Sequence, residues 1–478
     1  MINIKSMLRE AQAKFGSRNF VFTKKDGEFK PISYADFISK TNALADEMLS
    51  CGYADKNIII IGKNSVEYMM VDLAITAYVG ACVNINPAVD SDSLVKIIEK
   101  STPVAIFYDE DLASEFTELS IRFPDIKMQT IQEAVASIAQ NESNDNLPDK
   151  NPDACSKIIF TSGTTSEPKG VMLSLCNIFA GWEPLYRRTG FGDNGIEVVY
   201  VFLPLSHTYC NIYNFLYSFM YGPELYLCSN TDLIGKEILE VRPTAFCAVP
   251  IIYRRLFDAY GENIAQAFGD RIKYLYVGGA VFDKKLRAFY RDHGVPILEA
   301  YALTEVASSF AVDYPNPEDL ESTGVIYENI DAQIRNPDKR GVGDIVVKGE
   351  NVFMGYLNDP EKTRAAFTDD GYFVTGDYGY IKDGKIYVLG RENNVVVGEN
   401  GENVYLDEVL QNLNKIKESV AKVKATVKDD GLLKFTIYTS AEHYEDIPSI
   451  IEKYNELAMK KDRIDDYEIA SSDSISFK

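Results

Sequence analysis

The residues best able to do chemistry form one continuous segment, residues 158–170, with the sequence IIFTSGTTSEPKG. Its first residues read as a strand, and five hydroxyl side chains, two glycines and Lys169 follow. Glycine lets backbone N–H groups approach an oxyanion, hydroxyl groups donate hydrogen bonds, and lysine supplies positive charge. This combination predicts a phosphate-binding loop at the end of a strand. The loop is not of the Walker A type, because Gly-x-x-x-x-Gly-Lys-Ser/Thr is absent and Pro168 precedes the lysine.

Six further motifs follow in order along the chain: LPLSH at 203–207, GGA at 278–280, EAYALTE at 299–305, FVTGDYG at 373–379, GRENNVVV at 390–397 and GENVYLDEV at 401–409. Together with the phosphate loop, they resemble the AMP-forming adenylating enzymes, the superfamily of acyl-CoA synthetases, luciferases and carrier-protein adenylation domains. The resemblance runs over essentially the whole chain. It implies a reaction in which a carboxylate attacks the α-phosphate of ATP, pyrophosphate leaves, and a thiol then captures the acyl group.

The resemblance also implies which side chains bind the nucleotide. Tyr301 would present an aromatic face to the adenine, Asp377 would accept hydrogen bonds from both ribose hydroxyls, and Arg391 would contact the ribose. The full expected set is Thr161, Ser162, Gly163, Thr164, Thr165, Lys169, Gly278, Gly279, Ala280, Glu299, Tyr301, Thr304, Asp377, Arg391 and Lys478. Two positions depart from the usual pattern, since Ser166 and Ala302 stand where the family commonly has glycine.

Catalysis is expected to depend on Lys169, His207, Glu305 and Lys478. Glu305 offers an oxygen ligand suited to Mg²⁺, which usually takes one or two protein carboxylates and several waters. Thr161 is the second expected metal contact. By family analogy His207 gates the acyl pocket, although a histidine beside an aromatic-rich run is often structural.

Lys478 is the expected adenylation lysine, whose ammonium would bridge the substrate carboxylate and the α-phosphate. The chain ends Ser-Ile-Ser-Phe-Lys, whereas the family commonly has Gly-Lys and further basic residues there. Lys460 and Lys461 are the alternatives. Gly401, Glu402 and Asn403 are expected beside the path of CoA or pantetheine.

The elements that must position these motifs alternate between strand and helix. Residues 56–62, 66–78 and 81–85 read as strand, helix and strand, and the same order recurs over 272–299. Such alternation predicts parallel sheets with helices on both faces, and so an α/β fold. Asp383-Gly384 and Asp430-Gly431 predict hairpins near the end of the chain.

We therefore expect a large N-terminal domain of stacked mixed α/β subdomains over 1–389, which binds ATP and the acyl group. A small, mobile α+β C-terminal domain is expected over 390–478, with a hinge near 391–394. The pivot would be Asn393, where the family usually has Asp or Lys.

Composition narrows the classes of partner. Forty-nine Lys and Arg against 71 Asp and Glu give a net charge of −22 over 478 residues, which disfavours nucleic acid. The seven cysteines contain no Cys-x-x-Cys pair and indicate neither disulfides nor zinc. The first twenty residues lack the apolar core of a secretory signal, and the apolar run 66–83 contains Glu67 and Asp72. The prediction is a cytoplasmic protein with no integral membrane segment.

These features predict an ATP-dependent, AMP-forming acid–thiol ligase, most concretely an acyl-CoA synthetase that uses ATP, Mg²⁺ and CoA. The acid is expected to be hydrophobic, because residues 206–222 contain no Asp or Glu to pair with a buried amino-acid ammonium. LPLSHTY and residues 241–250 most resemble the medium- and long-chain fatty acyl branch.

The alternative is a ligase that loads a carrier-protein phosphopantetheine. A phosphotransferase, which would release ADP, and a non-catalytic nucleotide-binding protein are more distant hypotheses. Against the latter, the charged residues Lys169, Glu305, Asp377 and Arg391 are all present. Chain length, the thiol acceptor and the oligomeric state are left open.

Overall fold

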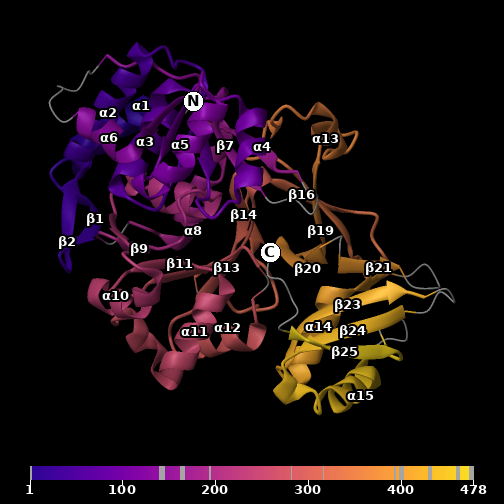
Figure 1. Ribbon diagram of the computed structural model, residues 1–478. Helices are drawn as coiled ribbons and strands as arrows, with labels where there is room; N and C mark the ends of the chain where they lie inside the picture. Colours follow the sequence, from indigo (N-terminus) through magenta and orange to yellow (C-terminus); the bar gives the residue numbers. More distant parts are fainter. Residues whose placement is uncertain are drawn as a thin grey trace. The chain divides into compact units, whose positions relative to one another are not determined.

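The computed structural model describes residues 3–138, 146–161, 167–192, 195–280, 282–315, 317–391, 394–397, 403–428, 433–458 and 463–472. The chain divides into two compact units (Figure 1). Unit 1 comprises Met1–Asp331 and Lys348–Phe373, and unit 2 comprises Ala332–Val347 and Val374–Lys478. The domain boundary at 390 and the hinge remain predictions, and the expected pivot, Asn393, lies outside the described residues.

The first sheet of unit 1 has the strand order β18-β8-β7-β4-β3-β5-β6. Its strands are β3 (Asn57–Ile61), β4 (Ala81–Ile85), β5 (Ala105–Tyr108), β6 (Lys127–Thr130), β7 (Cys155–Thr161), β8 (Lys169–Ser174) and β18 (Gly355–Tyr356). The pairs among β3 to β7 are parallel, whereas β8 pairs antiparallel with both β7 and β18. The isoleucine run of β3 is buried on both faces, as expected for a central parallel strand.

The second sheet of unit 1 runs in the order β15-β14-β13-β12-β11-β9-β10-β1-β2. Its strands are β1 (Asn19–Lys25), β2 (Glu28–Ser33), β9 (Val198–Val201), β10 (Glu224–Leu227), β11 (Ala245–Ala248), β12 (Tyr274–Val277), β13 (Ile297–Leu303), β14 (Ser308–Val312) and β15 (Val325–Ile326). From β1 through β13 every pair is parallel, so the carboxyl ends of these strands lie at one edge. That edge is where ligands bind in open α/β sheets.

Helices connect the parallel strands and cover the sheets of unit 1. The α-helices are α1 (Ile4–Phe15), α2 (Tyr34–Ser50), α3 (Val66–Ala74), α4 (Ser91–Ser101), α5 (Ala113–Arg122), α6 (Ile131–Ser137), α7 (Leu175–Ala180), α8 (Trp182–Thr189), α9 (Ser218–Tyr221), α10 (Ile234–Val241), α11 (Pro250–Tyr260), α12 (Lys284–Asp292) and α13 (Pro360–Ala365). The 3₁₀ and π turns are η1 (Ile75–Val79), η2 (Glu110–Leu112), η3 (Tyr209–Leu216), η4 (Thr231–Leu233), η5 (Gly261–Phe268) and η6 (Thr304–Val306).

Local signals explain where several of these helices begin. Asp90 and Asp283 accept hydrogen bonds from backbone N–H groups three residues on, as N-caps of α4 and α12. Ser174 forms a reciprocal capping box with Asn177 at the start of α7. In the part of the chain that is described, no helix has both the length and the apolar character needed to cross a bilayer.

The described part of unit 2 contains three groups of strands, β16-β17-β19-β20, β21-β22 and β23-β24-β25, and two α-helices. Its elements are β16 (Asp331–Arg335), β17 (Gly343–Lys348), β19 (Phe373–Lys382), β20 (Lys385–Arg391), β21 (Val395–Val397), β22 (Asn403–Tyr405), α14 (Leu406–Ile416), β23 (Val420–Val427), β24 (Leu433–Thr439), η8 (Ala441–His443), α15 (Ile447–Leu457) and β25 (Tyr467–Ser471). β19 and β20 form the predicted hairpin, in which Asp383 and Gly384 both have positive φ. The second predicted hairpin joins β23 to β24, and β25 adds to it in parallel.

Candidate functional site

The two ends of the phosphate-loop motif lie where β7 connects to β8. Thr161 at the end of β7 and Lys169 at the start of β8 are cross-strand neighbours. The sheet therefore fixes both ends of the segment between them. Ser162, Gly163, Thr164 and Thr165 lie outside the described residues, so their part in phosphate binding remains a prediction.

Tyr356 links the phosphate-loop lysine to the expected metal ligand. Its strand, β18, pairs with β8 so that Tyr356 is opposite Val171. The Tyr356 hydroxyl donates to Glu305 Oε1 at 3.0 Å, and Lys169 Nζ lies 5.5 Å from the centre of the Tyr356 ring. Burial raises the pKa of the Tyr356 phenol above its usual value, so the group remains a hydrogen-bond donor at neutral pH. Sequence analysis missed Tyr356, because a contact across 51 residues leaves no local signal.

The other nucleotide motifs of unit 1 lie at the carboxyl ends of β12 and β13. Val277 pairs with Glu299, so the GGA segment that follows β12 is level with the middle of β13. Gly279 has a φ of +82°, a conformation that side chains with a Cβ rarely adopt. Glu305 lies in η6, directly after β13, and its backbone oxygen accepts a 2.8 Å hydrogen bond from Phe353 N. Gly278, Gly279, Ala280, Thr304 and Glu305 are therefore brought to the same edge of the sheet.

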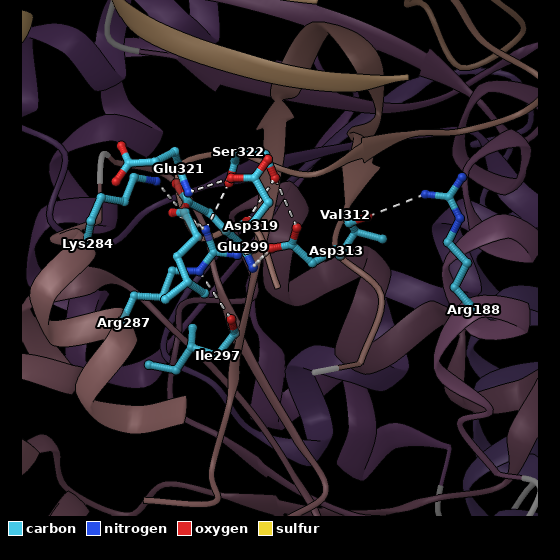
Figure 2. A network of polar contacts seen from close by, with 11 residues as sticks. Arg188, Lys284, Arg287, Ile297, Glu299, Val312, Asp313, Asp319, Glu321 and Ser322 are labelled. Carbon is cyan, nitrogen blue, oxygen red and sulfur yellow. Dashed lines mark hydrogen bonds and ion pairs between the residues drawn. The ribbon is translucent and has the colours of Figure 1, made fainter. Parts of the chain in front are cut away.

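Glu299 belongs to a buried ion-pair network (Figure 2). Its Oε2 lies 3.0 Å from Arg287 and 2.9 Å from Lys284. The fully buried Arg287 also pairs with Asp313 and donates to the carbonyls of Leu320 and Ser322. Burial raises the pKa of Asp313 to about 6, although the Arg287 charge opposes this shift. Glu299 thus has internal partners for its charge, and its contact with the nucleotide remains a prediction.

Tyr301 is buried in β13, with a relative solvent exposure of 6%. Its ring centre lies 4.8 Å from that of Phe310 on β14, with the planes tilted by 60°. The ring is thus supported by the neighbouring strand. Its stacking on adenine remains a prediction.

The LPLSH segment is fixed by two asparagines. Asn64 donates to the Leu203 carbonyl and accepts from Leu205 N–H, both at 2.8 Å. Asn211 donates to the Leu205 carbonyl, also at 2.8 Å. His207 itself reaches solvent, and Asn86 Nδ2 approaches its Nε2 at 3.4 Å. Protein atoms around the ring still remove part of its hydration, which lowers the pKa of His207 and keeps the imidazole neutral at pH 7.

Asn211 is hydrogen-bonded to a buried ion pair. Asp72 of α3 and Lys157 of β7 are 2.6 Å apart, and neither side chain has any solvent exposure. Asp72 Oδ2 also accepts a 3.0 Å hydrogen bond from Asn211, and Lys157 donates to Asn84. These contacts connect β7, which leads into the phosphate loop, with the segment that carries His207. The sequence signals were Lys157 within the apolar run of β7 and Asp72, one of two charged residues in the apolar run 66–83.

Unit 2 holds the two expected ribose-binding residues together. Asp377 and Arg391 are cross-strand neighbours on β19 and β20, and Arg391 Nε lies 2.8 Å from Asp377 Oδ1. Asp377 is 4% exposed in its side chain and Arg391 is 58% exposed. Thr375 Oγ1 accepts from Asp377 N–H and donates to the Ile345 carbonyl, which holds the turn. The ion pair leaves the guanidinium largely accessible to a ligand.

Of the residues expected at the thiol path and of the candidate adenylation lysines, the structure describes only Asn403. Asn403 begins β22 and pairs with Val397. Gly401, Glu402, Lys460, Lys461 and Lys478 lie outside the described residues.

The expected Mg²⁺ contacts fit the usual preference of that ion. Among the described residues, no group of three or more His, Cys, Asp or Glu side chains could hold a metal. Glu305 is a single carboxylate that accepts a hydrogen bond from Tyr356. The chain after it continues into β14, which fixes the backbone on that side. One carboxylate, with water and phosphate oxygens completing the octahedron, is a common Mg²⁺ arrangement.

A mostly apolar cavity lies between the second sheet of unit 1 and the helices over it. Tyr209 and Tyr213 of η3 line one side, and Cys247, Tyr276 and Ala300 of the sheet line the other. None of the described residues that line it is charged. Because Ala300 precedes Tyr301 and Tyr209 follows His207 by two residues, the cavity adjoins the motif residues.

Comparison with known proteins places these features in a family. The family described as AMP-binding enzyme matches residues 8–357. The long-chain-fatty-acid–CoA ligase ACSBG2 of Gallus gallus is 24% identical over 493 residues, with 84% of this chain and 62% of that protein covered. ACSBG1 of Homo sapiens is 24% identical over 483 residues, with 83% and 65% covered. The chain thus spans less than two thirds of the length of these relatives.

Solved structures show the same fold. ATP-bound MatB from Rhodopseudomonas palustris matches with a TM-score of 0.85 and 21% identity, over 98% of this chain and 95% of that one. The o-succinylbenzoate CoA synthetase MenE from Bacillus subtilis, in complex with its acyl-adenylate intermediate, matches with a TM-score of 0.83 and 20% identity, over 98% and 95%. The predicted α/β fold is confirmed.

Proposed function

Because the chain belongs to the family of AMP-binding enzymes, we propose that it is an AMP-forming acid–thiol ligase, and specifically an acyl-CoA synthetase. The acid's carboxylate oxygen attacks the α-phosphorus of ATP, and the bond to pyrophosphate breaks. The CoA thiolate then attacks the acyl carbon, and AMP leaves. The observation that carries the proposal is the arrangement of Lys169 and Glu305 around Tyr356, which joins the two sheets of unit 1. Glu305 follows β13 at the edge of the second sheet that also bears Gly278–Ala280.

The residues of unit 1 have separate tasks in the first half-reaction. Lys169 supplies positive charge to phosphate oxygens at the end of the β7–β8 hairpin. Glu305 would hold Mg²⁺ together with Thr161 of the phosphate-loop motif, and the Tyr356 hydroxyl keeps the Glu305 carboxylate oriented. Bound Mg²⁺ would neutralise charge that builds up on the phosphates. Tyr301 would face the adenine.

The cavity supports a substrate acid whose acyl chain is hydrophobic and uncharged. An amino acid would bring an ammonium group beside side chains that carry no compensating charge. Burying such an unpaired charge costs several kcal/mol. His207, kept neutral at pH 7, would stand at the entrance of the cavity without repelling or trapping the carboxylate by charge.

Unit 2 would complete the reaction. Asp377 and Arg391 would bind the ribose, and Gly401, Glu402 and Asn403 would flank the thiol path. Lys478 would bridge the carboxylate and the α-phosphate, with Lys460 and Lys461 as alternatives. CoA is the proposed acceptor because the named relatives are CoA ligases, and a carrier-protein phosphopantetheine is the alternative.

A single assay tests the function. The protein is incubated with ATP, Mg²⁺ and one acid at a time from aliphatic, aromatic and amino-acid series, with CoA, with a phosphopantetheinylated carrier protein, or with neither. Pyrophosphate and AMP are measured, and thioesters are identified by mass spectrometry. We expect acid-dependent pyrophosphate release and acyl-CoA only when CoA is present. Release of ADP, or nucleotide turnover that ignores the acid, would contradict the proposal.

A further inference from the structure

We propose that the cavity of unit 1 is a closed acyl slot whose floor is Phe191, and that it selects an unbranched acid of medium length over long-chain fatty acids. This inference rests on the proposed ligase function for its use, but its geometry is independent of the chemistry. It also departs from the named relatives, which are long-chain-fatty-acid ligases.

The sheet provides one wall of the slot at regular levels. Val199 and Ala245 are paired across β9 and β11, and Cys247 is paired with Tyr276 across β11 and β12. Each of these residues lines the cavity, as does Ala300 at the upper level. Ala245, Cys247 and Ala300 are small, so the space above the sheet is left to a ligand or to the opposite wall.

The register of the strands gives the length of this wall. Ala300 is one position beyond the Val277–Glu299 pair, and Ala248 pairs with Val277, so Ala300 lies four positions above Ala245. At roughly 3.3 Å per strand residue the sheet wall of the slot from Ala245 to Ala300 is about 13 Å long. With carbon–carbon bonds of about 1.5 Å, a zigzag chain advances roughly 1.3 Å per carbon, so this length holds about ten carbons.

Phe191 closes the slot beside Ala245, and Ser218 and Pro223 complete the lining at that end. Tyr274, the strand neighbour of Ala245, has its ring centre 5.7 Å from that of Phe191 and donates its hydroxyl to the Gly190 carbonyl. The Phe191 ring also lies 5.1 Å from Tyr186 and 6.1 Å from Tyr221. Three aromatic neighbours thus hold Phe191 at the level of Ala245. Close-packed rings of this kind do not give way to a longer chain without loss of packing.

The slot is also narrow and uncharged. The cavity and its mouth together enclose about 530 Å³. Burial raises the pKa values of Tyr186, Tyr213 and Tyr276, so these phenols remain neutral. A slender alkyl chain with no charged group is the ligand that such walls accept.

Chain-length profiles test the slot. The kcat/KM of pyrophosphate release is measured for the purified protein with saturated acids from butanoic to hexadecanoic, and binding of the same acids is measured by calorimetry without ATP. We expect wild-type protein to favour octanoic or decanoic acid over hexadecanoic acid by at least tenfold in both measurements. Phe191→Ala should raise the relative kcat/KM and affinity for hexadecanoic acid about tenfold.

Two further variants sharpen the test. Phe191→Leu serves if the alanine variant does not fold. Phe289→Ala is the matched control, because its ring packs on Phe257 and His293 and does not line the cavity. The proposal is overturned if calorimetry ranks hexadecanoic acid highest in the wild type, or if folded Phe191 variants keep the wild-type ranking. If calorimetry ranks the affinities of the acids as expected but no acid causes pyrophosphate release, the result supports the slot and contradicts the ligase function.

Discussion

At the scale of single residues, Tyr356 restrains the Glu305 carboxylate before any metal binds. A carboxylate on a loop would lose conformational entropy when it binds a metal, but the Tyr356 hydroxyl already restrains one of its oxygens. Because Lys169 lies over the face of the same ring, one aromatic side chain contacts both the proposed phosphate-binding cation and the proposed metal-binding anion. The roles of the two can be separated by substitution.

Glu305→Gln should reduce acid-dependent pyrophosphate release by about 10²- to 10³-fold while the fold is kept, because it removes a charge that stabilises the phosphates in the transition state. Tyr356→Phe keeps the ring beside Lys169 and removes only the hydrogen bond, so we expect a smaller loss of roughly tenfold. Both variants are assayed over a Mg²⁺ titration, with circular dichroism as the control for folding. Wild-type release by Glu305→Gln at limiting Mg²⁺ would remove Glu305 from the site.

At the scale of elements, two buried charge networks hold strands and helices in register. The Asp72–Lys157 pair joins α3 to β7. The network around Arg287 joins α12 and β13 to Asp313, which directly follows β14 (Figure 2). Burying these charges is costly, so each network is stable only as a complete set of partners. Removing one member should therefore cost far more than an exposed ion pair of similar length.

Lys157→Met tests this for the first network. It leaves the Asp72 carboxylate buried without its cation, and we expect a loss of about 3 to 5 kcal/mol in the free energy of unfolding. The double variant Asp72→Asn/Lys157→Met should recover part of that loss, because the buried charge is then gone. Urea unfolding measures both. Lys434→Met, which breaks an exposed pair with Glu468 in unit 2, is the control and should change stability much less. Equal losses in the two methionine variants would contradict the account.

Asp313 gives the second network a pH dependence. Its pKa is about 6 in the fold and near the ordinary 3.8 in the unfolded chain, so between these values the folded state binds more protons. The contribution of Asp313 to stability is thus fully present below pH about 4 and declines as the pH rises through 6. Asp313→Asn should flatten the dependence of the unfolding free energy on pH in that window, whereas Asp125→Asn, on an exposed turn, should not. A slope unchanged from wild type in Asp313→Asn would rule the group out.

How far the sequence predicts this structure depends on how local the signal is. The hairpin at Asp383-Gly384, the strand–helix–strand order of 56–85 and the neighbouring positions of motif residues at β12 and β13 follow from turn chemistry and side-chain periodicity. Tyr356 and the Asp72–Lys157 pair do not, since their contacts cross 51 and 85 residues. Such partners are chosen by packing, and a single sequence does not reveal which distant side chains meet.

At the scale of the whole molecule, the proposed function requires the predicted small domain, residues 390–478 within unit 2, to serve two half-reactions. Adenylation needs a lysine at the α-phosphate, and thioester formation needs that place cleared for a thiol. One arrangement of a single small domain does not satisfy both requirements, so we expect motion at a hinge near 391–394. Asp407 of α14 contacts both ends of this segment, since it accepts hydrogen bonds from Arg391 N–H and from the Asn394 side-chain amide.

Asn393→Pro tests the hinge, since proline restricts φ at the expected pivot. Release of pyrophosphate in the absence of CoA reports adenylation, and conversion of preformed acyl adenylate with CoA reports thioester formation. We expect the second rate to fall at least about tenfold more than the first, because motion between the half-reactions is what the substitution hinders. Ser440→Pro is the matched control. Ser440 already has a φ of −72°, so proline fits there, and it lies in unit 2 beyond β24, away from residues 391–394. Equal slowing of both half-reactions by Asn393→Pro would place the pivot elsewhere, and a selective effect of Ser440→Pro would show that the response is not specific to the hinge.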